Sequence, residues 1–330
     1  MDFTNQPKVE LHLHLDCSLS YEVVAKIAPA INREQYLRDF IAPPQCHDLA
    51  QYLSHAQYSI RLMQTAQQLE WVTEDLARQL AREKVVYAEI RFAPLLHTQQ
   101  GLAPEAVVET VSSALARASA HHGLEARLIL CTLRHFTAAQ SLETARLAAR
   151  YRPALVVGFD IAGDEAGYPL EPHAAAFRYA HEQGIPCTAH AGEARGPESV
   201  WETLRLLRPQ RLGHGVRSLE DPRLLEHLLE RGLHLELCPT SNVQTGIYPT
   251  IAQHPVEAFR RQGLPFSINT DGRTLSDTSL SEEYCRLHQA FGWDATTFRR
   301  ANQQALAAAF LPSALKNRLL QRLNTSDENL

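Results

Sequence analysis

The sequence predicts an α/β fold of one domain, a (β/α)₈ TIM barrel in which eight parallel strands alternate with helices. Eight short segments rich in strand-forming residues recur along the 330 residues, and helical patterns fill the stretches between them. Most of these segments are nearly continuous apolar runs, as expected for parallel strands covered on both faces. No linker-like or low-complexity stretch divides residues 1–330, and this length suits one barrel.

The predicted strands are spread along most of the chain. We expect them at residues 8–15, 85–92, 126–133, 155–163, 185–193, 211–215, 234–242 and 265–272. A doubly wound open sheet is the competing α/β architecture, but it usually has a glycine-rich phosphate turn after its first strand. Here Asp16, Cys17 and Ser18 follow the first strand, without a glycine. The barrel is therefore the preferred prediction.

Helix signals lie between the predicted strands. Pro104 is typical of the first turn of a helix, and Gly123 is typical of a helix end, so a helix is expected between them. The polar tail, residues 324–330, is predicted to be frayed.

Residues 18–84 form an unusually long connection after the first strand. Helical stretches are expected around 20–29, 48–69 and 73–84, with Thr73 as the N-cap of the last one. An insertion at the carboxyl end of the first barrel strand would cover the mouth of the barrel as a lid.

The composition excludes several classes of protein. A net charge of −5 and a pI near 6.3 argue against a nucleic-acid-binding or membrane-binding surface. No secretory signal or membrane-spanning run is visible. The six scattered cysteines contain no C-x-x-C pair, as expected for reduced thiols. We therefore expect a cytoplasmic protein without nucleic-acid or membrane partners, and the sequence leaves its oligomeric state open.

The first predicted strand carries two imidazoles on one face. Because side chains alternate along a strand, His12 and His14 share a face with Glu10 and Asp16, while leucines occupy the other face. Such a strand faces either water or a site that uses two neutral imidazoles. The surrounding apolar run makes exposure to water the weaker interpretation.

Further titratable residues fall at the ends of later strands. His190 and Glu193 end the fifth predicted strand, His214 lies in the sixth, and Asp271 lies near the end of the eighth. In a barrel, the carboxyl ends of all strands converge on one pocket. Two histidines of the first strand, His190 and Asp271 would offer three imidazoles and a carboxylate, a set that suits Zn²⁺ and other divalent metals.

Each of these residues also has an ordinary interpretation. Asp271 can be a turn residue, and Glu193 can be a carboxylate at the start of the following helix. A buried histidine is more often a hydrogen-bonded core residue than a ligand. That interpretation, or solvent exposure, is adopted for His47, His55, His97, His121, His122, His173, His181, His227, His254 and His288. The coincidence of four candidate residues at strand ends favours the metal site.

The scarcity of lysine narrows the type of site. No lysine lies between Lys84 and Lys316, which excludes a lysine-bridged pair of metals and a Schiff-base lysine in the middle strands. One metal is therefore expected.

His234-Leu235-Glu236 matches half of the cytidine deaminase signature, but the P-C-x-x-C half is missing. His234 and Glu236 are therefore interpreted as ordinary strand residues.

The predicted site suits hydrolysis at a carbon that carries an amine or ester leaving group. A single zinc ion lowers the pKa of its water to ~7. Glu193 could stay protonated and donate to a substrate nitrogen, while His214 could orient the water or stabilise an oxyanion. Asp271 could accept the proton of the water. No cluster of arginine or lysine indicates a phosphate site, which favours a neutral substrate.

The motifs PKVELHLHLD, TAHAGE, RLGHG, LELCPTSN and SINTDG, in this order, closely resemble the adenosine deaminase family of metal-dependent purine deaminases. The resemblance extends from Pro7 to about Phe310 and implies a TIM barrel that holds one zinc ion. The metal ligands that it implies are His12, His14, His190 and Asp271.

The same resemblance implies roles toward a nucleoside. Glu193 would protonate purine N1, and His214 would position and polarise the hydroxide that attacks C6. The backbone of Gly163 would contact the purine, and Asp16 would bind the ribose 5′-hydroxyl. The remaining expected substrate-binding positions are His14 and Gly272.

Three positions depart from the pattern of the family. Gly272 stands where many members have a second aspartate that contacts purine N7, and Arg273 follows it. Cys17 stands where many members have glycine. Ala56 ends the lid pattern, where an aromatic residue is common, and a smaller residue there would admit a larger substituent on the nucleoside.

The sequence thus predicts a zinc-dependent deaminase of adenosine and 2′-deoxyadenosine that releases inosine-type products and ammonia. The alternatives are deamination of adenine, N6-methyl-AMP or aminodeoxyfutalosine, a mononuclear metallohydrolase of esters or amides, and a barrel that binds purines without turnover. Asp16 argues against a phosphate, because a second anion would be repelled. The preferred aminopurine and the identity of the metal stay open at this point.

Overall fold

The computed structural model describes residues 3–152 and 155–324. Eight parallel strands form two four-stranded sheets with sequential strand order. The first sheet contains β1 (Lys8–His14), β2 (Val85–Phe92), β3 (Glu125–Leu133) and β4 (Val156–Ala162). The second sheet contains β5 (Thr188–Ala191), β6 (Arg211–His214), β7 (His234–Leu237) and β8 (Phe266–Ile268).

Two parallel bridges join the sheets into a closed barrel. Phe159 in β4 pairs with Cys187, just before β5, and Leu13 in β1 pairs with Asp271, after β8. At the second junction the amide of His14 donates to the carbonyl of Asp271 at 2.8 Å. The predicted (β/α)₈ barrel is confirmed, and its closure places Asp271 beside the histidine-bearing strand.

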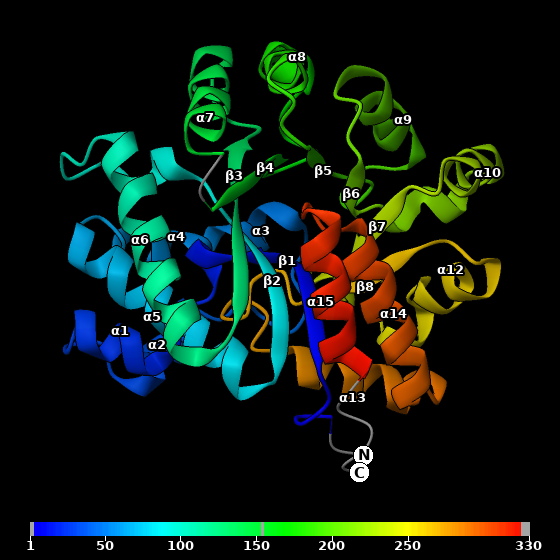
Figure 1. Ribbon diagram of the computed structural model, residues 1–330, viewed down its shortest axis with the longest axis horizontal. Helices are drawn as coiled ribbons and strands as arrows, with labels where there is room; N and C mark the ends of the chain where they lie inside the picture. Colours follow the sequence, from blue (N-terminus) through cyan, green and yellow to red (C-terminus); the bar gives the residue numbers. More distant parts are fainter. Residues whose placement is uncertain (1–2, 153–154, 325–330) are drawn as a thin grey trace.

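Helices surround the strands (Figure 1). After β2, the α-helices are α6 (Pro104–His122), α7 (Ala138–Tyr151), α8 (Ala174–Glu182), α9 (Pro197–Leu206), α10 (Pro222–Arg231), α11 (Pro239–Gln244), α12 (Val256–Gln262), α13 (Leu280–Phe291), α14 (Ala295–Ala308) and α15 (Ser313–Asn324). Short 3₁₀ helices are η1 (Leu15–Cys17), η2 (Pro94–His97), η3 (Glu171–His173), η4 (Val216–Glu220) and η5 (Ile251–Gln253). Helix α6 begins at Pro104 and is followed by Gly123 in the left-handed conformation, as predicted.

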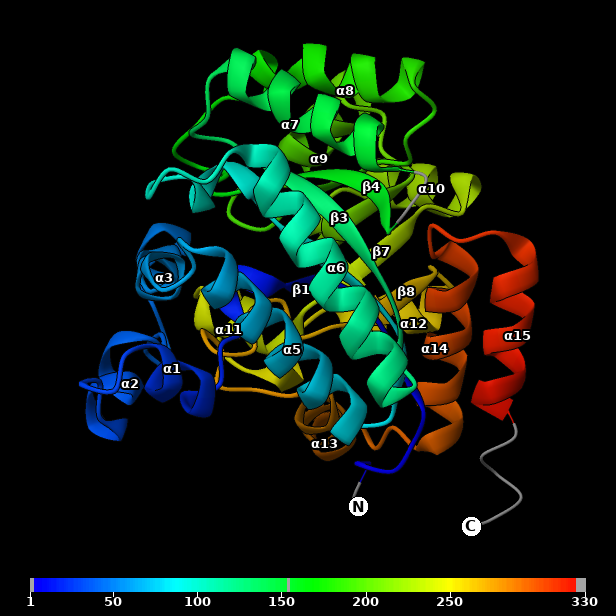
Figure 2. The same cartoon turned by 60° about the vertical axis from the view of Figure 1, so that its left-hand side comes forward.

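The alternation of β1 is also seen in the packing. Val9 and Leu11 are buried in a cluster with Leu306 of α14 and Leu319 of α15, two helices that lie side by side in Figures 1 and 2. Removing a buried leucine from such a cluster typically costs about 2–5 kcal/mol. The apolar face of β1 is thus turned to helices, which leaves its histidines for the barrel interior.

The insertion between β1 and β2 contains five helices, which are α1 (Tyr21–Ile27), α2 (Arg33–Asp39), α3 (Leu49–Ser54), α4 (Ala56–Arg61) and α5 (Ala66–Arg82). In Figure 2, α1, α2 and α3 lie together on the side of the barrel away from α14 and α15. Helix α2 was not predicted, although Asn32 and Gln35 form a capping box at its start. The lid role of this segment remains a prediction.

The predicted N-cap at Thr73 is wrong. Helix α5 begins after Thr65, which forms a capping box with Gln68. Thr73 lies inside the helix, and its hydroxyl donates to the carbonyl of Leu69 at 2.7 Å. Helix α5 is thus continuous from Ala66 to Arg82. It covers the end of the helical stretch predicted at 48–69 and most of the one predicted at 73–84.

Several strands are shorter than predicted at their carboxyl ends. Strand β7 stops at Leu237 because Pro239 begins α11, so the expected strand 234–242 is half helical. Strand β5 stops before Gly192, and β8 stops at Ile268. The predicted frayed tail lies outside the described residues, apart from Asn324. Within the described ranges, no helix has both the length and the apolar character of a membrane span.

Candidate active site

A pocket with about 380 Å³ of empty space, part of it open to solvent, lies at the carboxyl ends of the barrel strands. The residues that line the pocket come from the ends of β1, β4, β5 and β6, from η1, from α3 and from the segment after β8. They are His14, Cys17, Leu49, Tyr52, Leu53, Ala162, Gly163, His190, Glu193, His214, Asp271, Gly272 and Leu275.

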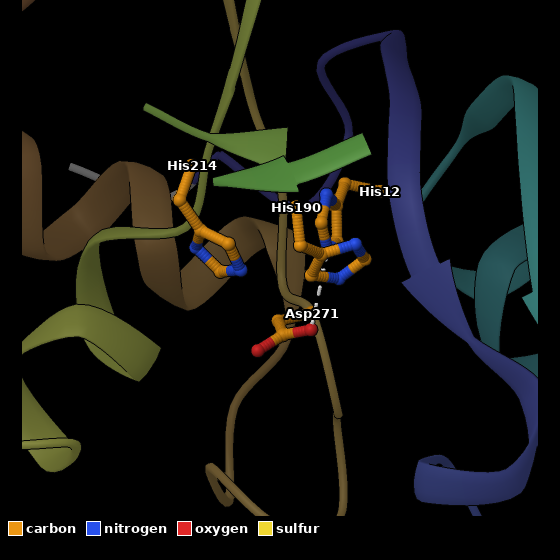
Figure 3. A group of neighbouring side chains, drawn as sticks. All are labelled: His12, His190, His214 and Asp271. Atoms are coloured by element: carbon orange, nitrogen blue, oxygen red, sulfur yellow. Dashed lines mark ion pairs between the residues drawn. The ribbon is translucent and has the colours of Figure 1, made fainter. Parts of the chain in front are cut away.

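Four titratable side chains converge beside this pocket. His12, His190, His214 and Asp271 each offer a ligand atom, and these atoms lie within 4.8 Å of one another (Figure 3). His14 joins them, since its Nε2 lies 3.2 Å from His190 Nε2 and 3.3 Å from Asp271 Oδ1. All four predicted metal ligands are therefore brought together, with His214 as a fifth neighbour.

The residues fit a divalent metal ion. His12 Nε2 is buried and makes no hydrogen bond, although Asp271 Oδ1 lies 3.3 Å away. The imidazoles of His12, His14 and His190 and the carboxylate of Asp271 are the kind of donor set that zinc and related cations prefer.

Two buried carboxylates orient two of the imidazoles. His12 Nδ1 lies 2.9 Å from Glu236 Oε2, and His190 Nδ1 lies 3.2 Å from Asp160 Oδ2. Arg91 joins both carboxylates, donating to Asp160 at 2.8 Å and to Glu236 at 2.7 Å. Because an ionised carboxylate only accepts, each Nδ1 carries the ring proton and leaves the lone pair on Nε2 for the cluster.

The prediction that Glu236 is an ordinary strand residue is therefore wrong. Burial acts to raise the pKa of Glu236, but Arg91 and Arg211 beside it hold the pKa well below its usual value. Arg211 Nε lies 2.7 Å from Glu236 Oε1. Arg91, Asp160 and Glu236 are charged residues in the middle of three barrel strands, which was the signal that the sequence offered for their role. Their pairing could not be predicted from local spacing, because it depends on how the barrel closes.

Glu193 faces the cluster from the loop after β5. Its Oε2 lies 3.5 Å from His214 Nε2, and its Oε1 is buried without a hydrogen-bond partner. Burial, and then the negative charge of Asp271, raise the pKa of Glu193 well above its usual value. The alternative role at the start of α9 is not observed, since Gly196 occupies the N-cap and no side chain caps that helix.

Glu165 holds the loop that carries Glu193. Its carboxylate accepts hydrogen bonds from four consecutive backbone amides, and the one from Glu193 measures 2.9 Å. Ser199 Oγ also donates to Glu165, at 2.5 Å. Sequence reasoning did not single out this residue, because its partners lie about thirty positions further along the chain.

Two site residues have an unusual backbone. His214 has a φ of 57° and Asp271 a φ of 62°, in the left-handed region that residues other than glycine rarely adopt. Ser241 Oγ donates to Asp271 Oδ2 at 2.7 Å. Gly213 lies behind His12, and a Cβ atom there would be 2.9 Å from His12 Cε1, so a side chain at position 213 would displace the imidazole.

The remaining predicted substrate-binding residues differ in exposure to the pocket. Gly163 lines it, with a φ of 98°. Asp16 is buried beside it and is not among its lining residues. Its Oδ2 accepts from the amide of Ala93 at 3.3 Å and lies 3.8 Å from His97 Nε2. Ala56 is likewise buried and does not line the pocket.

Cys17 and Gly272 lie against each other in the pocket wall. A Cβ atom at Gly272 would be 2.8 Å from Cys17 Cβ, closer than real side chains approach. Arg273 points to other partners, since its guanidinium forms ion pairs with Glu10 and Glu83. The cysteine thus occupies the space that a side chain at position 272 would need.

Comparison with known proteins decides the family. Residues 7–326 match the family model described as adenosine deaminase. This chain belongs to the adenosine deaminase family. It is 38% identical to an adenosine deaminase from Mycobacterium sp. (strain KMS), over 94% of this chain and 92% of the relative. It is 34% identical to an adenosine deaminase from Clostridium acetobutylicum, over 97% of this chain and 98% of the relative. The resemblance seen in the sequence is confirmed, and the protein is a hydrolytic deaminase.

Solved structures share the fold of this chain. An adenine deaminase from Arthrobacter aurescens has a TM-score of 0.90 at 25% identity, covering 98% of this chain and 99% of that one. An amidohydrolase from Burkholderia ambifaria with bound Zn has a TM-score of 0.89 at 22% identity, covering 99% of this chain and 93% of that one. The second likeness shows the fold alone.

Proposed function

We propose that this deaminase hydrolyses adenosine and 2′-deoxyadenosine to inosine-type products and ammonia, with one zinc ion held by His12, His14, His190 and Asp271. The observation that carries the proposal is the buried carboxyl of Glu193, whose pKa is raised, in the same pocket as the histidine and aspartate cluster. The chemistry that a bound zinc ion supplies is a pKa of water lowered to ~7, so that hydroxide is available at neutral pH.

The side chains of the pocket supply the proton donor, the proton acceptor and the hydrogen-bond donor of the proposed reaction. Glu193, protonated because it is buried, donates its proton to the ring nitrogen next to the attacked carbon. Asp271, whose pKa stays well below its usual value despite burial because of the neighbouring histidines, is ionised and accepts the proton of the attacking water. His214 donates a hydrogen bond to the oxygen as it bonds to carbon. Gly163, in the wall after β4, offers its backbone to the base.

The charges of the pocket favour a nucleoside over a nucleotide. Glu193 and Asp271 line it, and no arginine or lysine is among its lining residues. Asp16, a buried carboxylate 3.9 Å from His14 Nδ1, is the group that we infer accepts a hydrogen bond from a sugar hydroxyl. A phosphate in the same place would be repelled.

We place this activity in the cytoplasm. All six cysteines are free thiols, as expected in a reducing compartment. The predicted partner is the small-molecule nucleoside.

An absorbance assay with adenosine, 2′-deoxyadenosine, adenine, AMP and N6-methyl-AMP tests the proposal, with zinc measured on the same sample. We expect kcat/KM to be highest for the two nucleosides. Preferred turnover of AMP would overturn the role of Asp16, and preferred turnover of adenine would overturn the need for a sugar.

The variant Glu193→Gln tests the proton donor. An amide cannot supply the proton, so kcat is expected to fall by about 10²- to 10⁴-fold while the zinc content stays at one per chain. Full activity in this variant would remove Glu193 from the reaction.

A further inference from the structure

The proton of His254 can be located from its partners. The backbone amide of Val256 donates to His254 Nδ1 at 3.1 Å. A backbone N–H can only donate, so Nδ1 must be the unprotonated nitrogen. His254 is buried, and burial lowers its pKa to about 3, so the ring is neutral and its one proton lies on Nε2.

This proton fixes the orientation of an amide. His254 Nε2 lies 3.2 Å from Asn242 Oδ1 and therefore donates to it. The other end of the same amide, Asn242 Nδ2, lies 3.1 Å from His214 Nδ1. Asn242 is fully buried in α11, so its amide has no solvent alternative.

The direction of the hydrogen bond to His214 follows. An amide nitrogen donates and does not accept, so His214 Nδ1 is the acceptor and the ring proton lies on Nε2. That Nε2 is buried without a hydrogen-bond partner and lies 3.5 Å from Glu193 Oε2. The N–H of His214 is therefore directed into the active site.

The partners of the Nδ1 atoms separate the imidazoles of the cluster into two kinds. His12 and His190 have carboxylate partners, which accept, so their Nε2 atoms carry a lone pair. His214 has an amide donor as its partner, so its Nε2 carries a proton and cannot bind a metal. Of the five neighbouring side chains, His214 is thereby excluded as a ligand, although its distance from the others would allow it.

We propose that Asn242 and His254 are positioning residues that keep the ring proton of His214 on Nε2, so that His214 donates a hydrogen bond to the attacking oxygen and does not bind the metal. The catalytic part of this inference rests on the proposed deaminase reaction. The location of the proton does not, because it follows from the hydrogen bonds alone.

The tautomer is tested directly by ¹⁵N NMR of zinc-loaded protein labelled at histidine. The signals of His214 are assigned from their loss in His214→Gln. We expect an unprotonated Nδ1 and a protonated Nε2 in the wild type. A protonated Nδ1 would overturn the inference, whether or not the enzyme turns over adenosine.

The variant Asn242→Asp tests the positioning role. An aspartate of the same shape accepts from both histidines and draws the proton of His214 to Nδ1. We expect kcat for adenosine to fall by about 10²- to 10⁴-fold, the range for a wrong histidine tautomer or a lost oxyanion donor, while KM changes by less than about threefold. A protonated Nδ1 of His214 in this variant, together with an unchanged kcat, would contradict the positioning role of Asn242.

Two variants at His254 avoid the added charge. His254→Leu removes the group that orients the amide, whereas His254→Gln keeps an N–H that can donate to Asn242. We expect kcat to fall by about tenfold in the leucine variant and to be largely restored in the glutamine variant, with one zinc per chain in both. Equal losses in the two variants, or loss of zinc, would indicate a structural role only. Absence of adenosine turnover in the wild type would instead refute the proposed function.

Discussion

The Nδ1 atom of His12 lies 2.9 Å from Glu236 Oε2, with both side chains fully buried inside the barrel. This contact turns the lone pair of His12 toward Asp271. Arg91 links the same carboxylate to Asp160 and thus to a second histidine of the cluster. One buried arginine, Arg91, therefore joins the carboxylate partners of two proposed ligands.

Removing the charge of Glu236 is expected to weaken metal binding. In Glu236→Gln, the partner of His12 is no longer a charged acceptor, and we expect the affinity for Zn²⁺ to fall by about 10- to 100-fold. Competition with a chromophoric chelator measures this affinity. The exposed Glu226 offers a matched control, Glu226→Gln, which should bind zinc as the wild type does. Equal affinity in both variants would contradict the orienting role of Glu236.

Glu165 is expected to affect activity without touching the substrate. Its carboxylate accepts from the amides of residues 192–195, so Glu165→Gln replaces an acceptor of several hydrogen bonds with an amide whose NH₂ end cannot accept. We expect a loss of about 1–3 kcal/mol of unfolding free energy and a lower kcat, because the position of Glu193 is no longer fixed. Urea unfolding and steady-state kinetics measure the two effects. A variant that is destabilised but keeps its kcat would show that the loop does not position Glu193.

Cys17 and Gly272 are expected to be energetically coupled. Gly272→Ala puts a Cβ atom 2.8 Å from Cys17 Cβ and should destabilise the protein by about 1–3 kcal/mol. Cys17→Gly removes the clash, so the double variant should be more stable than the sum of the single effects by about 1 kcal/mol or more. Urea unfolding of all four proteins gives this coupling. Simple additivity would mean that the two residues do not compete for the same space.

Glu283 is expected to make stability depend on pH. Burial raises its pKa to about 7 from an ordinary value of 4.5, even though Arg286 Nη1 lies 3.6 Å away. Between these values the folded state keeps the proton that the unfolded state has lost. The stabilisation is therefore complete below pH 4.5 and is lost as the pH rises through about 7.

The isosteric variant Glu283→Gln has no such proton to lose. Its unfolding free energy relative to the wild type should therefore rise by about 3 kcal/mol between pH ~5 and pH ~8. Thermal and urea unfolding at the two pH values measure this difference. A constant difference would place the pKa of Glu283 near its ordinary value.

The parts of the fold that could be predicted from the sequence are those that local residue patterns determine. Apolar runs place all eight strands, and alternation places His12 and His14 on the interior face of β1. At Thr73 the helical periodicity outweighs the cap signal, because Leu69, Val72 and Leu76 form an unbroken buried stripe across that position.

Other parts of the site depend on contacts that no local pattern contains. Arg91, Asp160 and Glu236 lie in three different strands, and only the closed barrel brings them together. The same holds for Asn242 and His254, whose roles follow from the direction of two hydrogen bonds. The left-handed backbone of Asp271 fits the turn interpretation of this residue and not the strand predicted at 265–272.

The junction between β1 and the segment after β8 has a consequence for biosynthesis. The backbone bonds that join Asp271 to His12 and His14 unite the two ends of the barrel, as does the bond from Thr270 to Glu10, residues that are 260 positions apart. A chain emerging from the ribosome presents its histidines long before the aspartate that completes their set. We therefore expect the proposed metal site to be completed late in biosynthesis, because a nascent chain that lacks its last fifth has no Asp271.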